Sequence, residues 1–411
     1  MKLLHLLLAC TFLFISILPT FSQDKTKPSS GTNINSELFN QGMNSYTLRQ
    51  NFSYTRPKYL ADNGQELYKE NTLGIDAEWN YWFKKGLGAG LNLNYTSSGI
   101  HYPATDQLTR NWSINPTLSY GTELSKDWNA YLRGGVIFGG TKQIYKTGGS
   151  SNEEKGDQFG YNFSAAFPWE ISKQTAIVPE LYYEHIRTKY DDGKEIDNGY
   201  GLSLHLEDYL PCGGMKCDHS QGYKLSMGAY DQGSSMLNYN SNFGVNIGKS
   251  TLTYNSVPGS NITRYNNINF DGAYSNYIID NVAVGGRLGF LNMVQKSDDN
   301  TFRYNWTNFN FEPEVTLNAP VSNGFRNTFI RVGGILGAQK IEFKSPGTTN
   351  TDKYTTTGFQ LGGGYNTFFT DQSAIQLYGG YRSYVEKEKE TDNKTKVRGP
   401  FISIGVIHSF K

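Results

Sequence analysis

The sequence predicts an all-β protein, a transmembrane antiparallel β-barrel. Three observations support this: apolar and polar residues alternate along runs of about ten residues, the joints between runs alternate between short and long, and the N-terminus resembles an export signal. Successive side chains on a strand point to opposite faces, so each run has one apolar and one polar face. In a membrane barrel the apolar face meets lipid and the polar face lines the lumen.

The N-terminus predicts a cleaved signal peptide at residues 1–22. Lys2 supplies a positive start, residues 3–18 form an apolar run, and residues 19–22 read as a cleavage region. Residues 23–42 then form a periplasmic N-terminal segment. After the signal peptide no run approaches the roughly 20 apolar residues that a spanning helix needs, which excludes a helical membrane protein.

The composition fits a barrel better than a large soluble core. Hydrophobic residues make up only 37% of the chain and its mean hydropathy is −0.54, yet it contains 29 Tyr, 24 Phe and 45 Gly. Strands that need one apolar side, with aromatics at the membrane interfaces, use such a composition. The formal net charge of +1 gives no indication of a nucleic-acid partner.

Residues 43–210 form the first of two predicted barrel repeats, with eight alternating strands. Its short joints, such as residues 83–86, alternate with long polar ones at residues 57–71, 97–110, 141–157 and 188–198. Short periplasmic turns and longer extracellular loops are typical of outer-membrane barrels. The long joints are therefore expected to be extracellular loops.

Residues 249–411 repeat this pattern at an offset of about 195 to 200 residues. Residues 87–91 match residues 282–286, and residues 131–135 match residues 329–333. The linker, residues 211–248, contains a predicted extra hairpin, because residues 223–229 and 243–247 also alternate. An apolar-faced hairpin would be left unpaired between two separate barrels, whereas one sheet absorbs it. The sequence thus favours a single barrel of 16–18 strands built from two eight-stranded repeats; the alternative is two tandem eight-stranded barrels.

The linker also holds Cys212 and Cys217, followed by His219. In an oxidising periplasm a local Cys212–Cys217 disulfide is favoured, and a metal site that adds His219 is the alternative. No other metal-type spacing, catalytic triad spacing or phosphate-binding loop occurs. We therefore expect no metal, no cofactor and no enzymatic activity.

Glycine-rich and aromatic motifs at residues 82–90, 133–140 and 358–364 give the chain a family resemblance. Each half resembles the small eight-stranded outer-membrane barrels of the OmpA/OmpX type found in Bacteroidetes. The resemblance implies the outer membrane of a Gram-negative bacterium, surrounding outer-membrane lipid, and assembly by the barrel-insertion machinery. The C-terminus resembles the terminal insertion signal of such barrels through Ser403, Gly405, His408 and Phe410.

Charged residues on the polar faces are the candidate functional residues, since they would form a selectivity wall in the lumen. They are Asp76, Glu78, Arg133, Glu180, Glu207, Asp271, Arg287, Glu312, Glu314, Arg331 and Arg382. Sixteen to eighteen strands enclose an aqueous channel. The predicted function is a porin-like passive channel for small polar solutes or ions. The alternative is a non-conducting surface barrel whose loops bind a protein, a glycan or a host surface.

Overall fold

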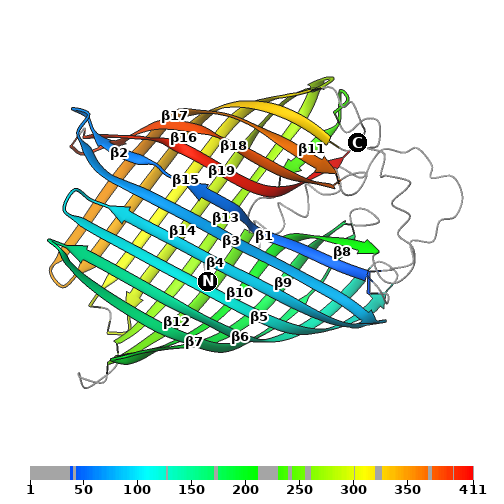
Figure 1. The fold of residues 1–411 in the computed structure, drawn as a ribbon, viewed down its shortest axis with the longest axis horizontal. Helices are drawn as coiled ribbons and strands as arrows, with labels where there is room; N and C mark the ends of the chain where they lie inside the picture. The colour runs from blue at the N-terminus through cyan, green and yellow to red at the C-terminus, as the bar shows by residue number, and fades with distance from the viewer. Residues whose placement is uncertain are drawn as a thin grey trace, which may run out of the picture. The chain divides into compact units, whose positions relative to one another are not determined.

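The structure is a computed structural model that describes residues 38–39, 43–125, 128–170, 175–211, 230–238, 243–254, 261–299, 301–319, 326–368, 373–391 and 393–410. These residues are almost entirely β-strand, and the strands run side by side around one barrel (Figure 1). In the described part of the chain, no helix has both the length and the apolar character needed to cross a membrane. The signal peptide, Cys212, Cys217 and residues 223–229 lie outside the described residues.

The strand segments alternate in direction around the barrel. In chain order they are β1 (Met43–Thr55), β2 (Lys58–Ala61), β3 (Glu66–Lys84), β4 (Leu87–His101), β5 (Thr105–Ser125), β6 (Trp128–Thr147), β7 (Ser150–Ala166), β8 (Trp169–Glu170), β9 (Thr175–Tyr190), β10 (Gly193–Pro211), β11 (Ser235–Asn238), β12 (Phe243–Tyr254), β13 (Asn261–Ile279), β14 (Val282–Ser297), β15 (Arg303–Asn318), β16 (Arg326–Ser345), β17 (Thr348–Phe368), β18 (Ser373–Glu388) and β19 (Lys394–Phe410).

These segments form a single closed antiparallel barrel of 16 strands. Three short segments complete neighbouring strands rather than adding to the count: β2 follows β1 beside β19, β8 pairs with the start of β9, and β11 precedes β12 beside β13. The sheet closes where β19 pairs with β1 and β2.

The prediction of two eight-stranded repeats is wrong, and so is the OmpA/OmpX-type assignment. Residues 193–204 of β10 pair continuously with residues 243–254 of β12, so the first eight strands do not close on themselves along their length. Residues 395–398 of β19 likewise pair with β2. At both junctions the two halves are therefore joined by hydrogen-bonded strands. The chain forms one large barrel rather than two small ones.

The predicted long loops are also mostly strand. β6 and β7 pair as far as Thr147 and Ser150, and they turn through Gly148 and Gly149, whose φ values are 57° and 88°. Both conformations are left-handed, which glycine adopts without a steric penalty. β9 and β10 similarly turn at residues 191–192. We call this end of the barrel the hairpin end and the opposite one the short-turn end.

The outer face of the barrel is apolar. Large side chains there remain exposed along neighbouring strands, including Leu118 at 69%, Leu132 at 60%, Phe163 at 57% and Phe359 at 56% of their surface. The inner positions between them carry polar groups, as Asn115 and Thr117 do on β5. A closed barrel with this polarity satisfies its backbone internally and suits a lipid environment.

An arginine on this outer face should destabilise the barrel according to its depth in the bilayer. Leu118→Arg is expected to cost about 2–4 kcal/mol of unfolding free energy if Leu118 lies near the midplane. Leu67→Arg, on β3 toward the hairpin end, is the control and should cost about 1 kcal/mol or less. Urea unfolding in lipid vesicles measures both. Equal costs would contradict an apolar belt limited to the middle of the wall.

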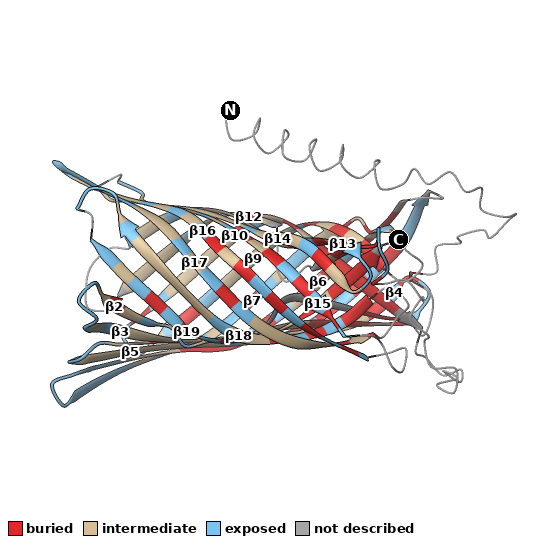
Figure 2. Cartoon of the chain, turned by 90° about the horizontal axis from the view of Figure 1, so that it is seen from above, coloured by how far each residue is buried: buried red, intermediate tan, exposed pale blue. Residues whose placement is uncertain are grey.

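At the short-turn end the pairing changes. Residues 43–46 of β1 pair with residues 208–211 of β10, and β11 pairs with residues 407–410 of β19. These ladders bridge the wall across the barrel at this end only. Figure 2 shows that buried residues gather mainly toward the end where β19 finishes, whereas the hairpin end is mostly intermediate or exposed.

Candidate functional site in the lumen

The predicted lumen charges all lie at inward positions of the wall. Those buried are Glu78, Arg133, Glu180, Glu207, Glu312, Glu314 and Arg331. Those partly exposed are Asp76, Asp271, Arg287 and Arg382. The structure gathers most of them into two clusters instead of spreading them along an open channel.

The first cluster surrounds Arg133 on β6, and we call it the Arg133 cluster. The guanidinium contacts the Glu78 carboxylate directly and lies 3.8 Å from Glu180 Oε1. It also donates to the Tyr131 hydroxyl at 3.2 Å, and that hydroxyl donates to Glu207 at 3.2 Å. One guanidinium thus serves three buried carboxylates. A buried charge of this kind is tolerated only when it is paired and hydrogen-bonded.

The second cluster surrounds Arg331 on β16. Arg331 Nε lies 3.5 Å from Glu314 Oε1, and the guanidinium stacks over Tyr378 at 4.9 Å from the ring centroid. Arg287 forms a two-pronged ion pair with Asp271, both nitrogen–oxygen distances being 2.6 Å. Such bidentate pairs are strong and fix the orientation of both groups.

The Arg331 cluster encloses a small polar cavity. It is lined by Asp271, Arg287, Glu312, Glu314, Arg331 and Tyr378 together with Ala273 and Gln360, and it has room for about one water molecule. The charges here are close to balance. The side chains of this cluster thus pair closely around a space of about one water molecule.

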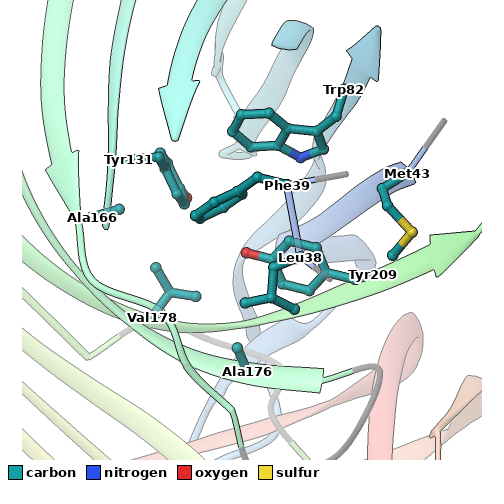
Figure 3. Packing of buried hydrophobic residues seen from close by; sticks show 9 residues of the cluster. All are labelled: Leu38, Phe39, Met43, Trp82, Tyr131, Ala166, Ala176, Val178 and Tyr209. Atoms are coloured by element: carbon teal, nitrogen blue, oxygen red, sulfur yellow. The ribbon is translucent and has the colours of Figure 1, made fainter. Parts of the chain in front are cut away.

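An aromatic plug lies below the Arg133 cluster at the short-turn end. Phe39, from the segment before β1, sits between Trp82 and Tyr131, with ring centroids 4.7 and 6.0 Å away (Figure 3). Leu38 packs beside it against Tyr209, and all these side chains are buried. The carbonyl of Phe39 accepts a 2.9 Å hydrogen bond from Gly86. The plug therefore fills the space between the strands of the first half at this end.

A second plug closes the lumen beside the Arg331 cluster. Tyr230, just before β11, packs against Tyr277 and Phe368 with centroid distances of 5.5 and 5.9 Å. Its carbonyl accepts a 2.8 Å hydrogen bond from Asn281, and its hydroxyl accepts one of 3.3 Å from Asn366. Both plugs are thus anchored through their backbone as well as packed.

The first plug depends on a glycine. A Cβ built on Gly121 of β5 would lie 2.7 Å from the Phe39 ring, so Gly121→Ala is expected to displace Phe39. Overpacking of this kind costs about 1–3 kcal/mol. Adding Phe39→Leu should recover part of the loss, and urea unfolding of the single and double variants measures it. Additive losses would contradict the contact.

Four buried polar side chains join the two sides of the barrel at the short-turn end. Ser373 donates to Asp208 at 3.1 Å and lies 2.9 Å from His408 Nδ1, while Thr175 donates to Asp208 at 2.6 Å. His408 belongs to the predicted insertion signal, and Ser403 and Gly405 of that signal pair with β18. The role of these residues in insertion stays a prediction.

The sequence did not indicate Leu38 or Phe39 as lumen residues, and it placed Tyr230 on the polar face of a hairpin rather than in a plug. Residues 23–42 were assigned to the periplasm, and of these the structure describes only Leu38 and Phe39, inside the barrel. Their signal was an apolar pair within a polar segment, which is too short for a periodicity. Within the described ranges, no group of three or more His, Cys, Asp or Glu side chains is arranged to hold a metal ion.

Comparison of the chain with known proteins found similarity to solved structures of low sequence identity. No protein-family model matches it, and no curated protein matches it. Among solved structures, CdiB from Acinetobacter baumannii is 12% identical, with 90% of this chain and 60% of that chain covered and a TM-score of 0.38. A Pseudomonas aeruginosa FadL homologue is also 12% identical, covering 93% and 95%, with a TM-score of 0.34. The Pseudomonas putida toluene transporter TodX is 10% identical, covering 93% and 94%, with a TM-score of 0.31. Similarity at this level says nothing about substrate.

Proposed function

We propose that the protein is an outer-membrane channel with a wide polar vestibule at the hairpin end and a closed short-turn end. The vestibule would admit small polar solutes or ions, and displacement of the plugs would let them through. The supporting observation is the lumen itself, where charged and amide side chains line the wall and Phe39 and Tyr230 pack the short-turn end. Residues toward the hairpin end are mostly intermediate or exposed (Figure 2). A 16-stranded wall is wide enough for an aqueous passage.

The outer-membrane location belongs to this proposal. It is supported by the closed barrel, the apolar outer face and the predicted signal peptide. The hairpin end would then face the exterior and the short-turn end the periplasm, as in other barrels of this type. Assembly by the barrel-insertion machinery follows from the same location.

Single-channel recording in planar bilayers tests the function. We expect the wild-type barrel to be mostly closed, and the double variant Phe39→Ala/Tyr230→Ala to give stable conductance steps. Tyr200→Ala is the control, since Tyr200 is an aromatic on the outer face with 64% of its surface exposed. Folding of each variant is checked by heat-modifiable gel migration. Silence from a folded double variant would overturn the channel.

The packed short-turn end also favours a second function, a non-conducting surface barrel. Both clusters and both plugs fill the lumen, which a surface anchor tolerates and a constitutive pore does not. The paired hairpins would then present the binding surface for a protein, a glycan or a host surface. Conductance steps from the plug variant would argue against this function.

A further inference from the structure

Two rows of inward positions run across neighbouring strands, starting two residues after Arg133 on β6 and two residues after Arg331 on β16. The two rows differ in their polar side chains. Gly135 of β6 pairs with Asn162 of β7, which pairs with Glu184 of β9. Gly333 of β16 pairs with Gln360 of β17, which pairs with Arg382 of β18. We call these the Gly135 row and the Gly333 row. In both, a proline on β5 or β15, Pro116 or Pro313, interrupts the ladder beside the glycine.

The side chains of the Gly333 row are joined to one another by hydrogen bonds. Gln360 Nε2 donates to Glu312 Oε2 at 3.1 Å, which closes the space over Gly333. Arg382 donates to Gln360 Oε1 at 3.5 Å and supplies a positive charge. Carboxylate, amide and guanidinium thus form one connected network.

The Gly135 row has a gap in the same place. Asn115 stands where Glu312 does and Asn162 where Gln360 does, each one methylene shorter. A Cβ built on Gly135 would collide with Asn115 Oδ1 and lie 2.6 Å from Asn162 Oδ1, so both amide oxygens point into the space over this glycine. Among the described residues neither oxygen accepts a hydrogen bond, although Asn115 is only 8% exposed. Buried acceptors of this kind are normally satisfied.

The Gly135 row also differs from the Gly333 row in its charge. Glu184 replaces Arg382, and in the described part of the chain it has no salt bridge. The ionisable groups near it, Asp197 and Tyr265, carry no positive charge. The adjacent Arg133 cluster already divides one guanidinium among three carboxylates. The row therefore presents two amide oxygens and one carboxylate with no cation.

We propose that Asn115, Asn162 and Glu184 bind a small monovalent cation, which takes the place that Arg382 holds in the other row. Neutral carbonyl oxygens replace the hydration shell of alkali-metal ions in selective pores, and an ammonium group can donate to the same oxygens. The proposal concerns binding, so it stands whether or not the barrel conducts. If the barrel conducts, the site would favour cations in this part of the lumen.

Equilibrium dialysis of the purified, detergent-solubilised full chain against radioactive Rb⁺ tests the proposal. We expect about one Rb⁺ per chain, displaced by K⁺ but not by the bulky cation N-methylglucamine. Glu184→Gln and Asn162→Leu should each weaken binding by at least about tenfold, because a charge-assisted contact or a ligand oxygen is lost. Asn308→Leu is the matched control, an inward asparagine on β15 outside both rows, and should leave binding unchanged.

A further variant distinguishes the loss of a cation-binding side chain from the loss of the fold. Glu184→Arg copies the charge of Arg382, so it should abolish Rb⁺ binding while the barrel keeps its heat-modifiable migration. Displacement of Rb⁺ by methylammonium at lower concentration than by K⁺ would assign the site to ammonium groups, and the reverse order to alkali-metal ions. No Rb⁺ binding by folded wild-type protein, or equal binding by the Glu184 and Asn162 variants, would overturn the proposal. Rb⁺ binding by the wild-type protein together with silence from the folded Phe39→Ala/Tyr230→Ala variant would overturn only the channel.

Discussion

Arg133→Met is expected to lower the free energy of unfolding by about 3–5 kcal/mol, because it leaves buried carboxylates without their cation. Arg133 contacts Glu78 and Glu180, both almost inaccessible to solvent, and supports Glu207 through the Tyr131 hydroxyl. Methionine fills a similar volume, so the loss reports charge rather than a cavity. Urea unfolding of the barrel in lipid vesicles, followed by tryptophan fluorescence, gives the value.

Arg264→Met is the control for this experiment. Arg264 pairs with Asp298 near the hairpin end, where both side chains are well exposed, and exposed ion pairs contribute about 1 kcal/mol or less. Repeating the Arg133 variant together with Glu78→Gln should restore part of the stability, since one uncompensated charge is removed. A cost for Arg133→Met no larger than that of the control would show that water reaches the cluster and that the lumen is open at this level.

Trp82→Ala is also expected to lower the free energy of unfolding by about 3–5 kcal/mol, because it leaves a cavity beside the first plug. The Trp82 ring is fully buried and contacts both Phe39 and Tyr131. Trp112→Ala is the matched control, since Trp112 lies on the outer face with 47% of its surface exposed, and its loss should be smaller. The temperature at which the folded gel band disappears ranks the two. Equal temperatures would place Trp82 outside a packed plug.

The sequence predicted the polarity of the wall correctly because alternation records it residue by residue. Leu118 and Leu132 face outward, and Arg133 and Arg331 face inward, as the period of two requires. The clustering of those charges was not predictable in the same way. It depends on which strands lie opposite each other across the lumen, as β3, β6 and β9 do where Glu78, Arg133 and Glu180 meet.

The errors have equally local causes. The strands near Gly148 continue past the region where one face meets lipid, so both faces are polar and the alternation that marks a strand disappears. The glycine and aromatic motifs behind the OmpA/OmpX resemblance describe the surroundings of single strands, which are alike in barrels of any size. Barrel size is decided at the seams, where β10 continues into pairing with β12. The alternating hairpin in the linker favoured a single barrel, whereas the repeated strand motifs did not indicate barrel size. Phe39 lies in a short segment without a periodicity, and the alternation that includes Tyr230 does not show that its ring packs as a plug.

In the proposed outer-membrane orientation, the extended hairpins would form the surface that faces the exterior. Strands such as β5, Thr105–Ser125, and β17, Thr348–Phe368, are about twice the length that crosses a bilayer, so their outer halves form a stiff collar of paired backbone. A receptor or antibody that binds this collar would lose little binding free energy to ordering the collar, because the strand ladders already hold the collar in one shape. Sequence change can accumulate at the glycine tips, whereas an insertion lower in the collar would have to break two ladders at once.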